Sequence, residues 1–397
     1  MNADISIRDA TAGELIESLR HTLAETSAPM IALHEPEFKG REKEYVTDCI
    51  ETGWVSSLGD YIVRFEQMVA EACGVKHAVA TVNGTAALHI ALLLAGVKQG
   101  DEVLAPALTF IATINAIAYC GAVPHFVDSE MASLGIDAAK LDAYLNTVAE
   151  RRDDHVVNRK TGRRIAALLP MHTFGHPVDL DAIVALAERW GLPLVEDAAE
   201  SLGSRYKGRP VGGFGLVGAM SFNGNKIVTT GGGGCVLTND DMIARRAKHI
   251  TTTAKHKHNW AFVHDEIGYN YRLPNLNAAL GCAQMERLDS FLGRKRALAK
   301  KYEASFRNSN TLTFVREPDY ATSNYWLNAV LLAPELGASR DLILEATNAA
   351  GFGVRPVWTL IPKLEMYADS PRMDLSCAED IERRLINIPS SPALAGA

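Results

Sequence analysis

Short apolar runs alternate with longer helix-forming segments between residues 77 and 238, and this alternation most constrains the fold. Apolar runs bounded by turn residues are typical of buried strands. When strands alternate with helices, the sheet is mostly parallel and helices cover both of its faces. We therefore predict an α/β fold. The expected strands are His77–Val82, Glu102–Ala105, Val123–Val127, Ile165–Pro170, Leu192–Glu196, Ala219–Phe222 and Gly234–Thr238, and the expected helices between them are Thr85–Ala95, Thr113–Cys120 and Leu180–Trp190.

The two ends of the chain have a different pattern. A helix is expected near Leu276–Leu292, and it continues into the charged stretch Arg294–Arg307, which has the composition of a solvated helix face. A strand at Trp326–Leu332 and a helix at Leu342–Ala350 follow. With 397 residues the chain is long enough for more than one domain. We predict a polar, helical lead-in over residues 1–30, a large α/β domain over 31–265 and a smaller C-terminal α+β domain over 266–397.

Charge and cysteine placement exclude several classes of protein. The net charge of −7 and a pI near 6.0 give no general attraction to nucleic acid or to anionic membranes. The longest apolar stretch, near Leu88–Val97, is much shorter than the ~20 residues that span a bilayer. The six cysteines are scattered without a CxxC pair, which predicts neither a disulfide framework nor a zinc site. We expect a soluble, cytoplasmic protein with small-molecule chemistry and no metal.

Three of the expected strands end in residues that suit a ligand. Asn83-Gly84-Thr85-Ala86 opens a helix, and free N–H groups at a helix start suit a phosphate, although an ordinary helix cap has the same pattern. Asp197 follows an apolar strand, where it either caps the next turn or pairs with a protonated ring nitrogen. Lys226 precedes the run Gly231–Gly234 and is either a surface charge or a lysine that forms a Schiff base.

Taken together, the three strand ends match the needs of one cofactor. A phosphate cradle, an anion for a ring nitrogen and an amine for an aldehyde are the parts that pyridoxal 5'-phosphate requires. An aromatic residue such as Phe110 could stack on the ring, although plain core packing explains it equally well.

The chain resembles the DegT/DnrJ/EryC1/StrS family of pyridoxal-phosphate sugar aminotransferases, which have the fold-type I architecture. The resemblance extends from about Ile31 to Pro392. It is carried by six motifs in order: Gly53-Trp54-Val55-Ser56-Ser57, Asn83-Gly84-Thr85-Ala86-Ala87-Leu88, Thr109-Phe110-Ile111-Ala112-Thr113, Glu196-Asp197-Ala198-Ala199-Glu200, Ser221-Phe222 with Lys226, and Gly268-Tyr269-Asn270-Tyr271-Arg272.

The resemblance implies a role for each matching residue. Lys226 is the expected catalytic Schiff-base lysine, and Asp197 is expected to pair with the pyridine nitrogen. The other expected cofactor-binding residues are Gly84, Thr85, Ala86 and Ser221 at the phosphate, Phe110 on the ring, Glu200 near the ring hydroxyl and Asn270. Family members commonly have Gln or His where this chain has Glu200, so the role of Glu200 stays open. Asn270 is expected to reach the partner's site, which implies a homodimer with shared active sites.

The resemblance also suggests a substrate. Segments around Leu33-His34-Glu35-Pro36 and Tyr325–Asn328 are similar to aminotransferases of the legionaminic-acid type. They suggest amino transfer, with glutamate as the expected donor, to the 4-keto group of a UDP-linked 4-keto-6-deoxy-N-acetylhexosamine in surface-glycan biosynthesis. The alternative is a GDP- or dTDP-linked 3- or 4-keto-6-deoxy sugar. The candidates for substrate contact are Tyr325, Arg355 and Trp358.

Three further possibilities remain at this point. The cluster Lys255-His256-Lys257-His258 either meets the diphosphate of the substrate or is a solvated loop, and we expect no metal there. A sugar dehydratase of the same fold typically has His in place of Lys226. A non-catalytic sensor would have no need of that lysine. The presence of Lys226 disfavours both alternatives.

Overall fold

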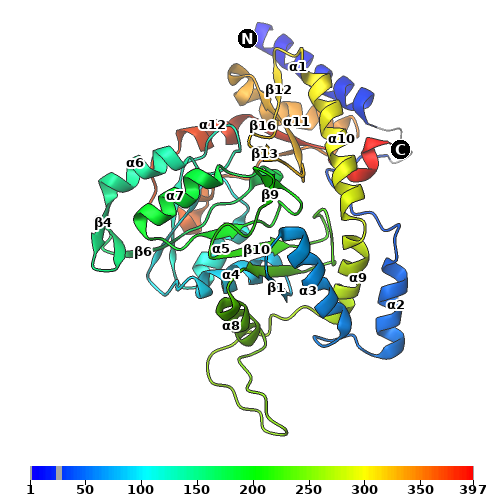
Figure 1. The fold of residues 1–397 in the computed structure, drawn as a ribbon. Helices are drawn as coiled ribbons and strands as arrows, with labels where there is room; N and C mark the ends of the chain where they lie inside the picture. The colour runs from blue at the N-terminus through cyan, green and yellow to red at the C-terminus, as the bar shows by residue number, and fades with distance from the viewer. Residues whose placement is uncertain (1, 24–28, 397) are drawn as a thin grey trace.

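The computed structural model describes residues 2–23 and 29–396, and helices cover both faces of its central sheet (Figure 1). The order across the sheet is β1 (His77–Thr81), β11 (Gly234–Thr238), β10 (Val217–Ser221), β7 (Val195–Asp197), β6 (Arg164–Leu168), β2 (Glu102–Pro106) and β3 (Val123–Val127). From β10 to β3 neighbouring strands are parallel, and isolated parallel bridges join β7 to β6. The prediction of an α/β fold with a mostly parallel sheet is confirmed.

Strand β11 is the exception, because it runs antiparallel to both β1 and β10. Parallel neighbours need a crossover, which is usually a helix, whereas the connection 222–233 contains no helix. The chain therefore turns back directly beside β10. A hairpin of β4 (Ala149–Arg152) and β5 (His155–Asn158) extends the sheet next to the start of β6.

Alternate side chains of the central strands enter two separate cores. In β1, Ala78 and Ala80 pack into the core beneath α3 and α9, whereas Val79 packs into the core beneath α4, α5 and α8. Strands buried on both faces explain the continuous apolar runs in the sequence. The helices of this part are α2 (Glu42–Thr52), α3 (Asp60–Cys73), α4 (Gly84–Leu94), α5 (Ile111–Tyr119), α6 (Ala138–Val148), α7 (Leu180–Trp190), α8 (Asp241–Thr251) and α9 (Asn275–Met285).

The C-terminal part forms an antiparallel sheet in the order β12 (Leu312–Phe314), β14 (Asn328–Leu332), β16 (Leu385–Ile388) and β15 (Arg355–Pro356), packed with α10 (Leu288–Phe306), α11 (Arg340–Ala349) and α12 (Ser376–Arg384). Helix α1 (Asn2–Thr22) lies beside α10 and α11 (Figure 1), and its Leu15 and Leu19 are fully buried there. A small sheet of β8 (Arg205–Tyr206), β9 (Arg209–Pro210) and β13 (Ala321–Thr322) completes the fold. The division at residues 265 and 266 stays a prediction.

The helix expected over Leu276–Leu292 is two helices, so this prediction is wrong in its bounds. Between α9 and α10 the backbone of Arg287 (φ −108°, ψ 3°) leaves helical geometry, and its side chain binds Glu37. The stretch Arg294–Arg307 is not a solvated face on all sides, because Lys295 and Tyr302 are fully buried against the C-terminal sheet.

Two features concern the surface. Among the helices of residues 2–23 and 29–396, none combines the length and the apolar character that crossing a membrane requires. A long loop, residues 252–270, projects away from α8 (Figure 1) and exposes Trp260, Phe262 and Ile267 almost completely.

Candidate active site

A cavity of about 350 Å³ lies where β7 and β10 end, beside the start of α4. It combines a helix start with buried carboxyl groups and a lysine. The larger hollows at α2 and α12 are shallow and lined mainly by charged side chains. The cavity is lined by Asn83, Gly84, Thr85, Leu88, Phe110, Ala112, Thr113, Met171, Asp197, Ala199, Glu200, Ser221, Asn223, Asn225, Lys226, Trp326 and Trp358.

The start of α4 forms one wall of the cavity. Asn83 caps the helix, because its side-chain oxygen accepts the N–H of Ala86 at 2.7 Å. A Cβ at Gly84 would lie 2.7 Å from Cβ of Ser221 and 2.9 Å from its Oγ, so glycine is required where α4 meets the end of β10. The first N–H groups of a helix have no acceptor within it. Together with the hydroxyls of Thr85 and Ser221 they can bind an anion.

Asp197 lies at the floor of the cavity at the end of β7 and is 2% exposed. Its Oδ2 accepts the hydroxyl of Thr113 at 2.6 Å, and its Oδ1 accepts the N–H of Ala199 at 3.1 Å. Burial raises the pKa of Asp197, and these two hydrogen bonds oppose the rise. Within residues 2–23 and 29–396, no cationic side chain forms an ion pair with this carboxylate. A buried carboxylate without a cation is costly, so a cationic ligand group would stabilise it.

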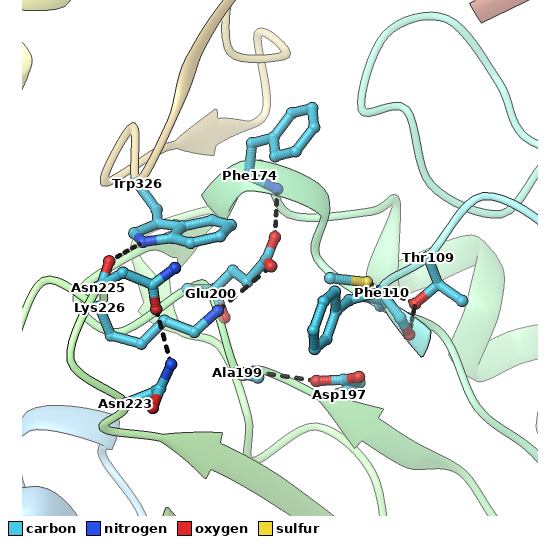
Figure 2. A network of polar contacts seen from close by, with 12 residues as sticks. Thr109, Phe110, Phe174, Asp197, Ala199, Glu200, Asn223, Asn225, Lys226 and Trp326 are labelled. Carbon is cyan, nitrogen blue, oxygen red and sulfur yellow. Dashed lines mark hydrogen bonds and ion pairs between the residues drawn. The ribbon is translucent and has the colours of Figure 1, made fainter. Parts of the chain in front are cut away.

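Lys226 enters the cavity from the connection after β10 (Figure 2). Its Nζ lies 3.3 Å from Oε1 of Glu200 and 3.7 Å from the centre of the Trp326 ring. The indole N–H of Trp326 donates to the carbonyl of Asn225 at 2.7 Å, which holds the ring over the amine. These contacts order a flexible lysine side chain and point its amine into the cavity.

Aromatic side chains cover the other side of the cavity. Phe110 is 49% exposed, and its ring centre lies 6.2 Å from that of Trp358. Trp358 in turn lies 5.1 Å from Phe174, which is fully buried. Phe110 therefore presents an open ring face to a planar ligand, as its predicted stacking role requires (Figure 2).

Four predicted site residues do not line the cavity. The N–H of Ala86 is already occupied by Asn83. Tyr325 is buried and its hydroxyl accepts the N–H of Glu317, while Arg355 binds Asn348. Of the three candidates for substrate contact, Trp358 lines the cavity, and so does Trp326, the residue after Tyr325. Asn270 is exposed at the base of the projecting loop, paired with Thr252.

The sequence analysis also missed residues that line the cavity. No role was predicted for Thr113, Asn223, Asn225 or Trp326, which all line it. Thr113 lies on the first turn of α5, and its hydroxyl is 2.8 Å from that of Thr109, four residues earlier and just before the helix. This spacing, next to a strand end, was the available signal.

The projecting loop brings together residues that the sequence keeps apart. At its base His249 Nε2 lies 2.7 Å from Oδ1 of Asp265, and His256 Nε2 lies 3.1 Å from Oδ2 of the same carboxylate. His249, Asp265 and Glu266 have the spacing of metal ligands, which the sequence analysis did not expect near this cluster. Arg246 binds both oxygens of Glu266, however, and so competes with any ion.

Comparison with known proteins identifies relatives of the whole chain. The model of the DegT/DnrJ/EryC1/StrS aminotransferase family matches residues 36–397. A GDP-perosamine synthase of Escherichia coli O157:H7 is 39% identical over 92% of this chain and 94% of its own. One from Caulobacter vibrioides is 37% identical over 93% and 95%. The solved aminotransferase TlmJ from Streptoalloteichus hindustanus superposes with a TM-score of 0.82 at 28% identity, covering 92% of this chain and 94% of that one.

Proposed function

Because the chain belongs to the DegT/DnrJ/EryC1/StrS aminotransferase family, we propose that it transfers an amino group from an amino acid to the keto carbon of a GDP-linked 4-keto-6-deoxy sugar. Membership makes it a pyridoxal-phosphate-dependent sugar aminotransferase. The nucleotide, the sugar and glutamate as donor are the proposal. The observation that carries it is one cavity that joins Lys226, Asp197 and the start of α4.

The groups around the cavity fit pyridoxal phosphate. When bound, this cofactor supplies an electron sink for the reacting carbon of the substrate. The N-terminus of α4 with Thr85 and Ser221 suits the phosphate, and Gly84 leaves the space that a Cβ would fill. The carboxylate of Asp197, which forms no ion pair within residues 2–23 and 29–396, suits a protonated ring nitrogen.

Each side chain then has a defined task. Lys226 would hold the cofactor through its Nζ and, when that amine is free, would move a proton to and from the reacting carbon. Asp197 would keep the ring nitrogen protonated, and Phe110 would cover the ring face. Trp326 covers the amine of Lys226, and Trp358 lines the same cavity. Of the predicted phosphate ligands we retain Gly84, Thr85 and Ser221 and omit Ala86, because its N–H already has a partner.

The relatives favour a GDP-linked substrate over the UDP-linked sugar that the sequence motifs suggested. Both GDP-perosamine synthases span more than nine-tenths of this chain. Perosamine is a 4-amino-4,6-dideoxy sugar, so its formation by amino transfer needs a 4-keto-6-deoxy precursor. This corresponds to the alternative substrate class of the sequence analysis.

We also propose a homodimer with shared active sites. Asn270 lies outside the cavity of its own chain, at the base of the loop 252–270. That loop exposes Trp260 (81%), Phe262 (80%) and Ile267 (84%), which is unusual for side chains that stay in water. A partner subunit would cover them and receive Asn270. A cytoplasmic location remains a prediction from the sequence.

The second half-reaction tests the substrate directly. The enzyme is loaded with pyridoxamine phosphate, freed of donor and mixed with GDP-4-keto-6-deoxymannose, while the return of pyridoxal absorbance is followed. We expect absorbance in proportion to sugar consumed and none with Lys226→Ala, which keeps the fold. A response only to UDP- or dTDP-linked keto sugars would refute the GDP assignment. No response to any keto sugar, or loss of a hydroxyl without amination, would refute amino transfer.

A further inference from the structure

We propose that the Glu200 carboxyl is a second proton-carrying group of the active site, which is protonated in the resting protein and exchanges this proton with the amine of Lys226. The inference deepens the proposed function and rests on it, because it assigns a task to the residue that departs from the family pattern. It starts from how the two oxygens of Glu200 are placed (Figure 2).

Within the described residues, each carboxyl oxygen of Glu200 has one hydrogen-bond or ion-pair partner. Oε2 accepts the backbone N–H of Phe174 at 2.9 Å, and Oε1 faces Nζ of Lys226 at 3.3 Å. The side chain is 2% exposed. Among the residues that the structure describes, the oxygen that faces the cavity has Lys226 as its single partner.

Glu196, four residues earlier in the chain, is a buried carboxylate that is stabilised by several hydrogen-bond donors. It accepts backbone N–H groups from Gly212, Phe214 and Gly215 at 2.5–2.9 Å, and it faces His172. Burial opposes its ionisation, but these donors outweigh burial and hold the pKa of Glu196 below its ordinary value. Glu200 is equally buried with one backbone donor, so its charged form is less compensated.

Three loops that pack against one another fix the position of Glu200. Phe174, whose N–H binds Oε2, has a left-handed backbone (φ 54°) that is strained for a residue with a side chain. Asn324 holds the carbonyl of Glu200 at 2.9 Å, and a Cβ at Gly175 would lie 1.8 Å from Oδ1 of Asn324. Strain retained at a ligand cavity is typical of a functional constraint.

The charged groups that face Glu200 are Lys226 and Asp197, and their effects oppose each other. Burial raises the pKa of Glu200 to about 7, with Lys226 lowering it and Asp197 raising it. At neutral pH the Glu200 carboxyl can therefore both hold and release a proton.

The exchange itself is a simple transfer. The O–H bond of Glu200 breaks as an N–H bond forms at Nζ of the free amine, leaving a carboxylate beside an ammonium. The reverse transfer returns the amine to its basic form.

Infrared spectroscopy of the cofactor-free protein tests the resting state. We expect a carboxylic-acid C=O band at neutral pH that is lost in Glu200→Gln, which keeps an acceptor for Phe174. The matched control is Glu102→Gln, far from the cavity, where hydrogen bonds from His125, Thr161 and Asn158 outweigh burial and lower the pKa of Glu102. That variant should lose no acid band. An unchanged acid band in Glu200→Gln overturns the proposal.

A second variant keeps the test decisive if Glu200→Gln does not fold. Lys226→Met removes the facing cation, and we expect the midpoint for loss of the acid band to rise by about 1 pH unit or more. An unchanged midpoint means that the two groups are not coupled and overturns the exchange. Neither infrared test uses a sugar or a donor, so a failed amino-transfer assay leaves them valid.

The holoenzyme supplies a kinetic readout. In the half-reaction with glutamate, the wild-type rate should show a titration near pH 7 that is absent in Glu200→Gln, with a rate about 10²-fold lower. A merely structural role would lower the rate and leave the shape of the pH profile unchanged.

Discussion

Replacing Thr113 with valine tests whether Asp197 is held as an anion. Valine keeps the shape of the side chain and removes the hydroxyl that donates to Oδ2 at 2.6 Å. A hydrogen bond to a charged group contributes about 1.5–3 kcal/mol, and one between neutral groups about 0.5–1.5 kcal/mol. We therefore expect Thr113→Val to lower the free energy of unfolding of the cofactor-free protein by about 2 kcal/mol when Asp197 is ionised.

The pH dependence of this loss gives the prediction its sign. Burial raises the pKa of Asp197 above 3.8, so the folded state binds its proton more tightly than the unfolded state does. Asp197 consequently contributes less stability as the pH rises through its folded pKa. Removing the Thr113 hydroxyl raises that pKa further, so the loss in Thr113→Val should be larger near about pH 8 than near about pH 5.

Urea unfolding at the two pH values measures the effect. Thr113→Ser is the matched control, because it keeps the hydroxyl and loses a buried methyl group, at a cost of about 1 kcal/mol that should not depend on pH. Equal losses in Thr113→Val at both pH values would refute the reasoning, because they would show that the hydroxyl does not stabilise a charge.

Three further predictions concern other parts of the molecule. Gly84→Ala places a methyl group 2.7 Å from Cβ of Ser221 at the end of β10. The dissociation constant for pyridoxal phosphate, measured by fluorescence titration, should therefore rise about 10-fold or more. The control Gly293→Ala should leave it unchanged, because nothing lies within 4 Å of a Cβ at that position. Leu15→Ala should cost about 2–5 kcal/mol in urea unfolding because its side chain is fully buried, whereas a similar loss for the half-exposed Ile7→Ala would contradict the packing of α1. Burial holds the pKa of Cys235 well above its ordinary value, so its thiol should react with a disulfide reagent only after unfolding, and rapid reaction in the native protein would contradict that burial.

The Schiff-base lysine and the buried aspartate illustrate what local sequence contains. Lys226 and Asp197 each follow a buried strand, and parallel strands bring their carboxyl ends to the same edge of a sheet. The two side chains therefore line one cavity, as the alternating pattern predicted. Gly84 was predictable in the same way, because it follows a strand and opens a helix.

The environment of Glu200 was not predictable, because it comes from residues far apart in the chain. The N–H of Phe174 and the amide of Asn324 meet Glu200 only after three loops have packed together. That Trp326 and not Tyr325 lines the cavity also depends on this packing, because the chain turns here through a left-handed backbone at Tyr325 (φ 48°) instead of following a regular strand.

The sequence by itself determined the α/β architecture, the strand ends that carry the chemistry and the family, because hydrophobic periodicity and short motifs are local properties of the chain. Tertiary structure alone decided the hydrogen-bond partners of each buried carboxyl, and with them that the pKa of Glu196 is lowered whereas that of Glu200 is raised. The physical reason is that the free energy of a buried charge depends on the few donors within hydrogen-bond distance. Those donors are set by packing between segments that the linear sequence does not place together.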